Sequence, residues 1–136
     1  MDHELLWSVL NAQRANATLS GGELRAAAQD LAHIWSTTRS VLMAFDAVGE
    51  RIIGAAMAIS GQSLEVFDYT GPFPDRATCL LVGGTIAGPV GIVEAAAAVT
   101  RAGARRVEAA IIRGWPEPIP GVVRIRQIGE SHADVA

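Results

Sequence analysis

The sequence has little of several residue types, with a single cysteine, Cys79, and no lysine. One thiol cannot form a disulfide or a cysteine-based zinc site within one chain. The lack of lysine excludes a phosphate-loop lysine and a Schiff-base lysine. No apolar run approaches the roughly 20 residues of a membrane-spanning helix. The acidic N-terminus MDHELLWSVLNAQR also lacks the basic region of a signal peptide.

The net charge and the spacing of the histidines argue against two classes of binding partner, nucleic acids and metal ions. The formal net charge is −3, so no overall positive field attracts nucleic acid. His3, His33 and His132 share no metal-ligand spacing, and His33 is expected on the surface of a helix. We therefore expect a cytoplasmic protein with no metal site, which binds neither nucleic acid nor a membrane.

The length and composition predict one globular domain over residues 1–136. Half of the residues are hydrophobic and 18% are charged, which argues against disorder. Residues 2–15 have the apolar spacing of a helix. Ser20 stands three residues before Glu23, the spacing of a capping box, and predicts a second helix that ends near STTRS.

The rest of the chain alternates between strand and helix patterns. The expected strands are 41–45, 63–69, 77–84, 105–113 and 122–128, with 63–69 nearer an edge. The expected helices are 51–60 and 89–102, with Gly103 as a C-cap glycine. DAVGER (46–51) is predicted to be a turn, and Arg124 and Arg126 are predicted to face water. The alternation indicates an α/β fold, a three-layer α/β/α arrangement around a mostly parallel sheet.

Two predicted turns lie where such sheets bind ligands, beyond the carboxyl ends of the strands. One is DAVGER, and the other is GGTIAGPVG (83–91). The second turn lacks the central glycine of a dinucleotide fingerprint, and no acidic residue ends the following strand. It also lacks the Lys-Ser/Thr pair of a Walker loop. A Rossmann-like nucleotide-binding domain is therefore kept only as a second alternative.

VGGTIAGPVGIVEAA (82–96) resembles the VDDVITTGATLLEAA signature of type I phosphoribosyltransferases. FDAVGERIIGAAMA (45–58) is similar to the pyrophosphate-loop segment of orotate phosphoribosyltransferases, and GGELRAAAQDLAHIW (21–35) to the helix before their first strand. The resemblance covers roughly residues 20–115. It implies a phosphoribosyltransferase-like fold with a reduced hood and catalytic loop, because only TGPFPDRAT (70–78) fills the interval of that loop.

The resemblance also places the vestigial sites. The phosphate loop of phosphoribosyl pyrophosphate (PRPP) falls on Gly83, Gly84, Thr85, Ile86, Ala87, Gly88, Pro89, Val90 and Gly91. The equivalent of the pyrophosphate loop falls on Asp46, Ala47, Val48, Gly49, Glu50 and Arg51. The acidic pair of the family falls on Gly83 and Gly84, and the threonines of its phosphate cradle are missing. Asp46 and Glu50 place negative charge where an anion would bind.

These departures predict a catalytically inactive relative with no catalytic residues, which serves as a binding, regulatory or structural module. Its expected partners are a second copy bound through residues 2–15, a protein partner or a small phosphorylated ligand. Residues 2–15 equally fit packing on the sheet edge. The alternative is an active phosphoribosyltransferase that uses Asp46, Glu50 and Asp68, and only this alternative implies Mg²⁺ as a cofactor.

Other polar residues allow two interpretations each. Asp46 and Glu50 are either a displaced acid pair or solvated loop acids. Asp68 and Tyr69 are either part of a binding crevice or the end of a strand. Arg113 and Trp115 either form one wall of a pocket or simply turn the chain.

Overall fold

The computed structural model describes residues 19–68, 72–74, 77–84, 90–112 and 117–129. The helices in this part of the chain are α2 (Gly21–Thr38), α3 (Ala47–Ser60) and α4 (Val90–Ala102). The strands are β1 (Val41–Ala44), β2 (Thr78–Gly83), β3 (Arg106–Ile111) and β4 (Arg124–Gln127). The predicted helix 2–15 lies outside the described residues.

The strands form one parallel sheet in the order β1-β2-β3-β4. Leu42 in β1 also bridges Val66 in parallel, through Leu42 N–H to Glu65 O and Phe67 N–H to Leu42 O. Since β2 occupies the other side of β1, the Val66 segment marks the opposite edge. The predicted strand 63–69 is thus at an edge as expected, but in the described residues it is an isolated bridge and no continuous strand.

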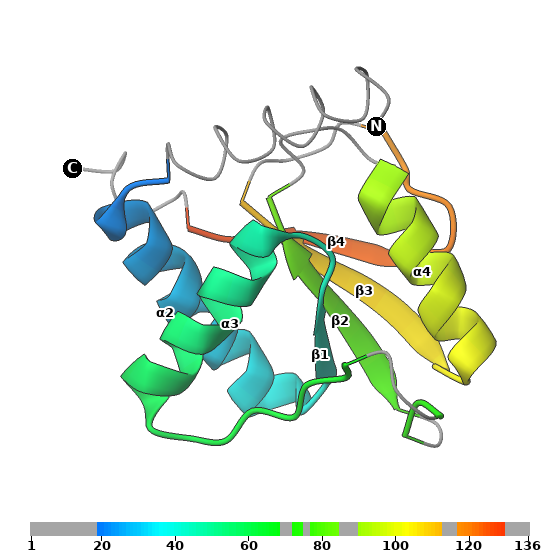
Figure 1. Ribbon diagram of the computed structural model, residues 1–136, viewed down its shortest axis with the longest axis horizontal. Helices are drawn as coiled ribbons and strands as arrows, with labels where there is room; N and C mark the ends of the chain where they lie inside the picture. The colour runs from blue at the N-terminus through cyan, green and yellow to red at the C-terminus, as the bar shows by residue number, and fades with distance from the viewer. Residues whose placement is uncertain (1–18, 69–71, 75–76, 85–89, 113–116, 130–136) are drawn as a thin grey trace, which may run out of the picture.

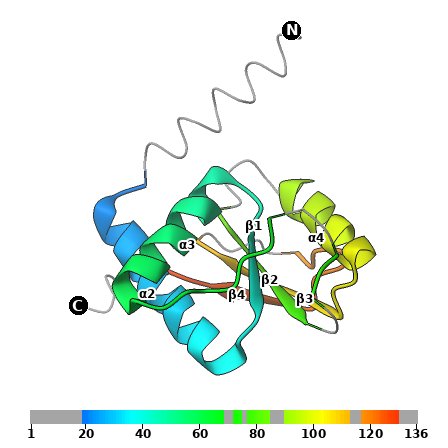
Figure 2. The ribbon, with the colours of Figure 1, turned by 60° about the horizontal axis from the view of Figure 1, so that its bottom comes forward.

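Helices cover both faces of the sheet, as the sequence predicted (Figure 1). α2 and α3 lie side by side on one face and α4 lies on the other, which the rotated view also shows (Figure 2). The described part is therefore α/β and consistent with three layers. Among the described residues, no helix combines the length and apolarity needed to cross a bilayer.

Alternate residues of the central strands pack in two hydrophobic cores, one on each face of the sheet. Leu42, Leu80, Val82 and Ala110 pack beneath α2 and α3, whose contributions include Leu31 and Ile52. On the other face, Met43, Leu81 and Ala109 pack against α4 residues such as Ile92 and Val99. The near-continuous apolar strands follow from this burial on both faces, which parallel sheets require.

The helix ends follow the signals in the sequence. Ser20 Oγ accepts a hydrogen bond from Glu23 N–H at 3.0 Å and caps α2. Gly103, with φ of 117°, ends α4, and Ala104 N–H donates to Val99 O at 3.0 Å. Only glycine takes such a φ without steric cost, so the predicted C-cap is confirmed.

Candidate functional site

The carboxyl ends of β1 and β2 lie next to each other. Ala44 is in register with Val82, and Phe45 N–H donates to Val82 O at 3.1 Å. The chain leaves β1 toward the Val66 edge and leaves β2 toward β3. This reversal is the switch point at which open α/β sheets bind ligands. The two segments that the sequence singled out as turns therefore start side by side.

Asp46 connects these two turns. Its Oδ1 accepts a hydrogen bond from Gly49 N–H at 2.8 Å, which makes Asp46 the N-cap of α3. Its Oδ2 accepts a hydrogen bond from Gly84 N–H at 2.9 Å. Backbone N–H groups at a helix start and after a strand are the donors that anion sites use. In this protein an internal carboxylate binds one donor from the start of α3 and one from the residue after β2.

The predicted turn DAVGER is wrong for most of its length. α3 begins at Ala47, so Ala47–Arg51 form the first turns of a helix and only Asp46 precedes it. Val48 and Gly49 are buried, whereas Ala47, Glu50 and Arg51 are exposed. The missed signal is local, because Asp is a preferred N-cap residue and Glu50 adds an acid to the first turn. The pyrophosphate-loop equivalent is therefore a cap and a helix start.

Gly49 allows α3 to lie directly on the backbone of β2. A Cβ at this position would be 2.0 Å from Val82 O and 2.7 Å from Val82 C. Real Cβ atoms do not approach a backbone oxygen so closely, so any side chain would move the helix away from the strand. Sequence reasoning placed Gly49 in the site but did not find this packing role.

The positions at which the resemblance predicts an acidic pair, Gly83 and Gly84, are occupied by neighbouring groups. A Cβ on Gly83 would lie 2.5 Å from Phe45 Cζ, so the Phe45 ring fills the space that a side chain would need. Gly84 is buried, and its N–H is bound by Asp46. Neither position can present a carboxylate to a ligand. Phe45 was not singled out in the sequence, although its place between a strand and the capping Asp46 made it a neighbour of the site.

The rest of the segment predicted as a vestigial phosphate loop lies only partly within the described residues. Thr85, Ile86, Ala87, Gly88 and Pro89 lie outside the described residues. Val90 and Gly91 begin α4, and both are exposed. A Cβ on Gly91 would make ordinary contacts with Phe45, the nearest at 3.8 Å.

A groove of about 460 Å³ runs beside this crevice, between α3 and the Val66 segment. Glu50 and Asp68 line it together with apolar residues, and the full lining is Ala44, Glu50, Ile53, Gly54, Met57, Val66, Phe67 and Asp68. The structure thus brings Glu50 together with Asp68 and does not pair Glu50 with Asp46, which lies outside this lining. The groove is acidic and apolar, and this composition opposes an anionic ligand.

The other candidate residues divide into two groups. His33 is exposed on α2, as predicted. Cys79 is buried in β2, and burial raises the pKa of its thiol to about 12. Within the described residues, no cluster of three or more His, Cys, Asp or Glu side chains has a metal-binding arrangement. His3, Tyr69, Arg113, Trp115 and His132 lie outside these residues.

The prediction that Arg124 and Arg126 both face water is half right. Arg124 is exposed, but the side chain of Arg126 is only 23% exposed and pairs with Glu108 on β3. The sequence pattern showed that the two arginines share a face of β4. It did not show that α2 covers part of that face.

Comparison of the chain with protein-family models, with curated proteins and with solved structures found no significant match.

Proposed function

We propose that this chain is a phosphoribosyltransferase-like protein that has lost PRPP-dependent transfer and serves as a binding or regulatory module. The observation that carries the proposal is the position of the Asp46 carboxylate on Gly49 N–H and Gly84 N–H. A ligand phosphate that used these donors would first have to break two charge-assisted hydrogen bonds, each worth about 1.5–3 kcal/mol.

Two further features support the loss of activity. The Phe45 ring occupies the space above Gly83, where the resemblance places an acidic side chain for the ribose hydroxyls. Glu50 and Asp68 add negative charge to the neighbouring groove. Like charges oppose the binding of a pyrophosphate group. The proposal includes a cytoplasmic location, a second copy or a protein as partner, and room for a small ligand.

The test is a ¹⁵N NMR titration with PRPP, with and without Mg²⁺. We expect no saturable shift of the Gly49 and Gly84 amides at millimolar ligand. Saturable shifts of both amides at micromolar ligand would sink the proposal. The Asp46→Asn variant keeps an oxygen acceptor for Gly49 but has only one, and it removes the charge. We expect this variant to bind pyrophosphate at Gly84 more readily than the matched control Glu50→Gln, which loses the same charge on the exposed surface of α3.

An active transferase with an altered site is the second candidate. One observation favours it, since Glu50 and Asp68 bring two carboxylates to one groove beside the crevice. Carboxylates at that place could bind ribose hydroxyls or Mg²⁺. Turnover of PRPP with orotate or a purine base, lost in both Glu50→Gln and Asp68→Asn, would support this candidate. No turnover in the unaltered chain would exclude it for those bases.

A further inference from the structure

A second groove, of about 600 Å³, lies between α2 and β4, on the face of the sheet that α2 and α3 cover. β3 separates β4 from β2, so this groove is not part of the switch-point crevice. Its α2 wall consists of Asp30, His33 and Ile34, and its sheet wall consists of residues 124–128. Its lining therefore combines two arginines with apolar side chains.

The strand geometry sets the spacing of the two arginines. Arg124 and Arg126 are two residues apart in β4, so they project to the same face with their Cα atoms roughly 7 Å apart. In the register with β3, Arg124 lies opposite Glu108 and Arg126 lies opposite Ala110. Ala110 is fully buried in the core, so the ligand-accessible part of Arg126 lies toward α2, where the two walls of the groove meet.

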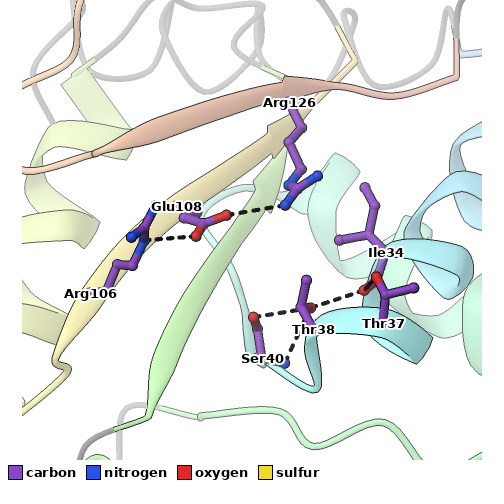
Figure 3. A network of polar contacts seen from close by, with 7 residues as sticks. All are labelled: Ile34, Thr37, Thr38, Ser40, Arg106, Glu108 and Arg126. Atoms are coloured by element: carbon purple, nitrogen blue, oxygen red, sulfur yellow. Dashed lines mark hydrogen bonds and ion pairs between the residues drawn. The ribbon is translucent and has the colours of Figure 1, made fainter.

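The charges in the groove are only partly compensated. Glu108 lies between two arginines (Figure 3). It accepts from Arg106 Nε at 2.9 Å, and its other oxygen is 3.5 Å from a terminal nitrogen of Arg126. The buried Nε of Arg126 has no hydrogen-bond partner in the described part of the chain. Among the same residues, the exposed Arg124 makes no ion pair with its side chain.

The acid on the other wall of the groove is Asp30. Asp30 Oδ2 accepts a hydrogen bond from Gly129 N–H at 2.8 Å, beyond the end of β4. Arg106 and Arg126 thus share the Glu108 carboxylate, and Arg124 has no ion pair among the described residues. The side chain of Arg126 is still 23% exposed in the groove, and guanidinium groups bind carboxylate and phosphate in a fixed fork geometry.

We propose that the groove between α2 and β4 binds a small ligand with two oxyanion groups, one at Arg124 and one at Arg126. The volume accepts a molecule of several heavy atoms beyond the anionic groups, and the partly exposed Ile34 provides apolar contact for its body. Both a diphosphate and a dicarboxylate have this chemistry. The inference does not depend on the proposed loss of transferase activity, because it concerns a different part of the sheet.

The experiment is a ¹⁵N NMR titration of the full chain with inorganic pyrophosphate and, separately, with succinate. We expect saturable shifts of the amides of residues 124–129 and 30–34, which weaken as salt is added. The stronger of the two probes identifies the source of the oxyanions as phosphate or carboxylate. Shifts of Gly49 and Gly84 instead would contradict the proposed function and would not support the groove.

Matched variants distinguish binding in the groove from a general effect of positive charge. Arg124→Gln removes an exposed arginine of the groove and should weaken binding of the better probe about tenfold or more, as expected for a lost hydrogen bond to a charged group. Arg25→Gln removes the same charge from an exposed position on α2 that does not line the groove. It should leave the affinity nearly unchanged. Equal weakening by both variants, or no saturable shift at millimolar concentrations of either probe, would overturn the proposal.

Discussion

Asp46 holds two backbone N–H groups that are far apart in the sequence, and each of its oxygens has a different task. Oδ1 caps α3 through Gly49, and Oδ2 fixes Gly84 after β2. The first task could be read from the sequence, since Asp before a helical pattern is a common N-cap. The second could not, because it requires the parallel pairing of β1 with β2.

Replacing Asp46 should therefore lower stability in two steps. Asp46→Asn keeps an oxygen acceptor for Gly49 but only one, and it should cost about 1.5–3 kcal/mol because buried Gly84 N–H loses its charged partner. Asp46→Ala removes both acceptors and should cost about 2–5 kcal/mol, the sum of a lost N-cap and a buried unpaired donor. Urea unfolding monitored by circular dichroism measures both values. Glu50→Gln, at an exposed site in the same turn, should change stability by less than about 0.5 kcal/mol. An Asp46→Ala cost no larger than that of Glu50→Gln would show that neither bond contributes.

Because of the buried thiol of Cys79, the free energy of unfolding should fall at alkaline pH. Burial raises its pKa to about 12 from the 9.0 of an exposed thiol, so the folded chain keeps a proton that the unfolded chain loses. The contribution is complete below the unfolded pKa and is lost as the pH rises toward the folded value. Near pH 10 the loss should be about 1.4 kcal/mol relative to neutral pH.

The measurement is a comparison of urea unfolding between the wild-type chain and Cys79→Ala across this range. The alanine variant is expected to be less stable at neutral pH, because it leaves a small cavity. Its disadvantage should shrink as the pH rises above 9. Parallel pH profiles for the two proteins would contradict the role of the thiol.

At the scale of the element, α3 depends on glycine at one position and tolerates it at another. Gly49 is pressed against the Val82 carbonyl, while a Cβ on Gly54 would meet nothing within 4 Å. The resemblance that placed both glycines in a pyrophosphate-loop segment treated them alike. Their difference arises from tertiary packing, which the pattern of one helix does not contain.

The two glycines therefore give opposite predictions within one helix. Gly49→Ala should destabilise the protein by about 1–3 kcal/mol or more, because α3 must shift from β2. Gly54→Ala should stabilise it by about 0.5–1 kcal/mol, because alanine is the better helix former and has open space. Thermal and urea unfolding of both variants provide the comparison. A destabilising Gly54→Ala, or a neutral Gly49→Ala, would mean that the helix and the strand are farther apart than described.

The elements themselves were largely predictable. Hydrophobic periodicity and caps indicated α2, α4 and the four strands, since each carries its signal within its own segment. The start of α3 was missed because DAVGER contains a glycine and charged residues, which are typical of turns. Segment 63–69 was predicted as a strand because apolar and polar residues alternate within it. Whether it pairs along its length depends instead on how far β1 extends beside it, and only one bridge forms.

At the scale of the whole molecule, the segments after β1 and β2 start side by side, joined by the hydrogen bond from Gly84 to Asp46, although the first begins α3 and is not a turn. The sequence predicted that two turns would start at these positions. It did not predict that the meeting place would be closed by Phe45 and Asp46, because both contacts cross between β1 and β2. The groove between α2 and β4 was missed for the same reason. A face of β4 that reads as solvent-exposed in the sequence is partly covered by a helix about ninety residues earlier in the chain.

The single sheet also determines how the molecule unfolds. Ile52 in α3 and Ile92 in α4 are both fully buried, but they pack on opposite faces of the same four strands. If the strands separate, both hydrophobic cores become exposed to water. We therefore expect one cooperative unfolding transition for the described part. Ile52→Val and Ile92→Val should each cost about 0.5–1.5 kcal/mol.

Native-state hydrogen exchange tests this coupling directly. If the transition is cooperative, either variant should reduce the protection of the slowest amides in α3 and in α4 by the same amount. Ile59→Val, which alters an exposed residue of α3, should leave both sets unchanged. A loss of protection confined to the helix that carries the substitution would instead show that the two faces of the sheet unfold separately. In that case, the contacts of Asp46 and Phe45 at the switch point would form while the other half of the molecule is unfolded.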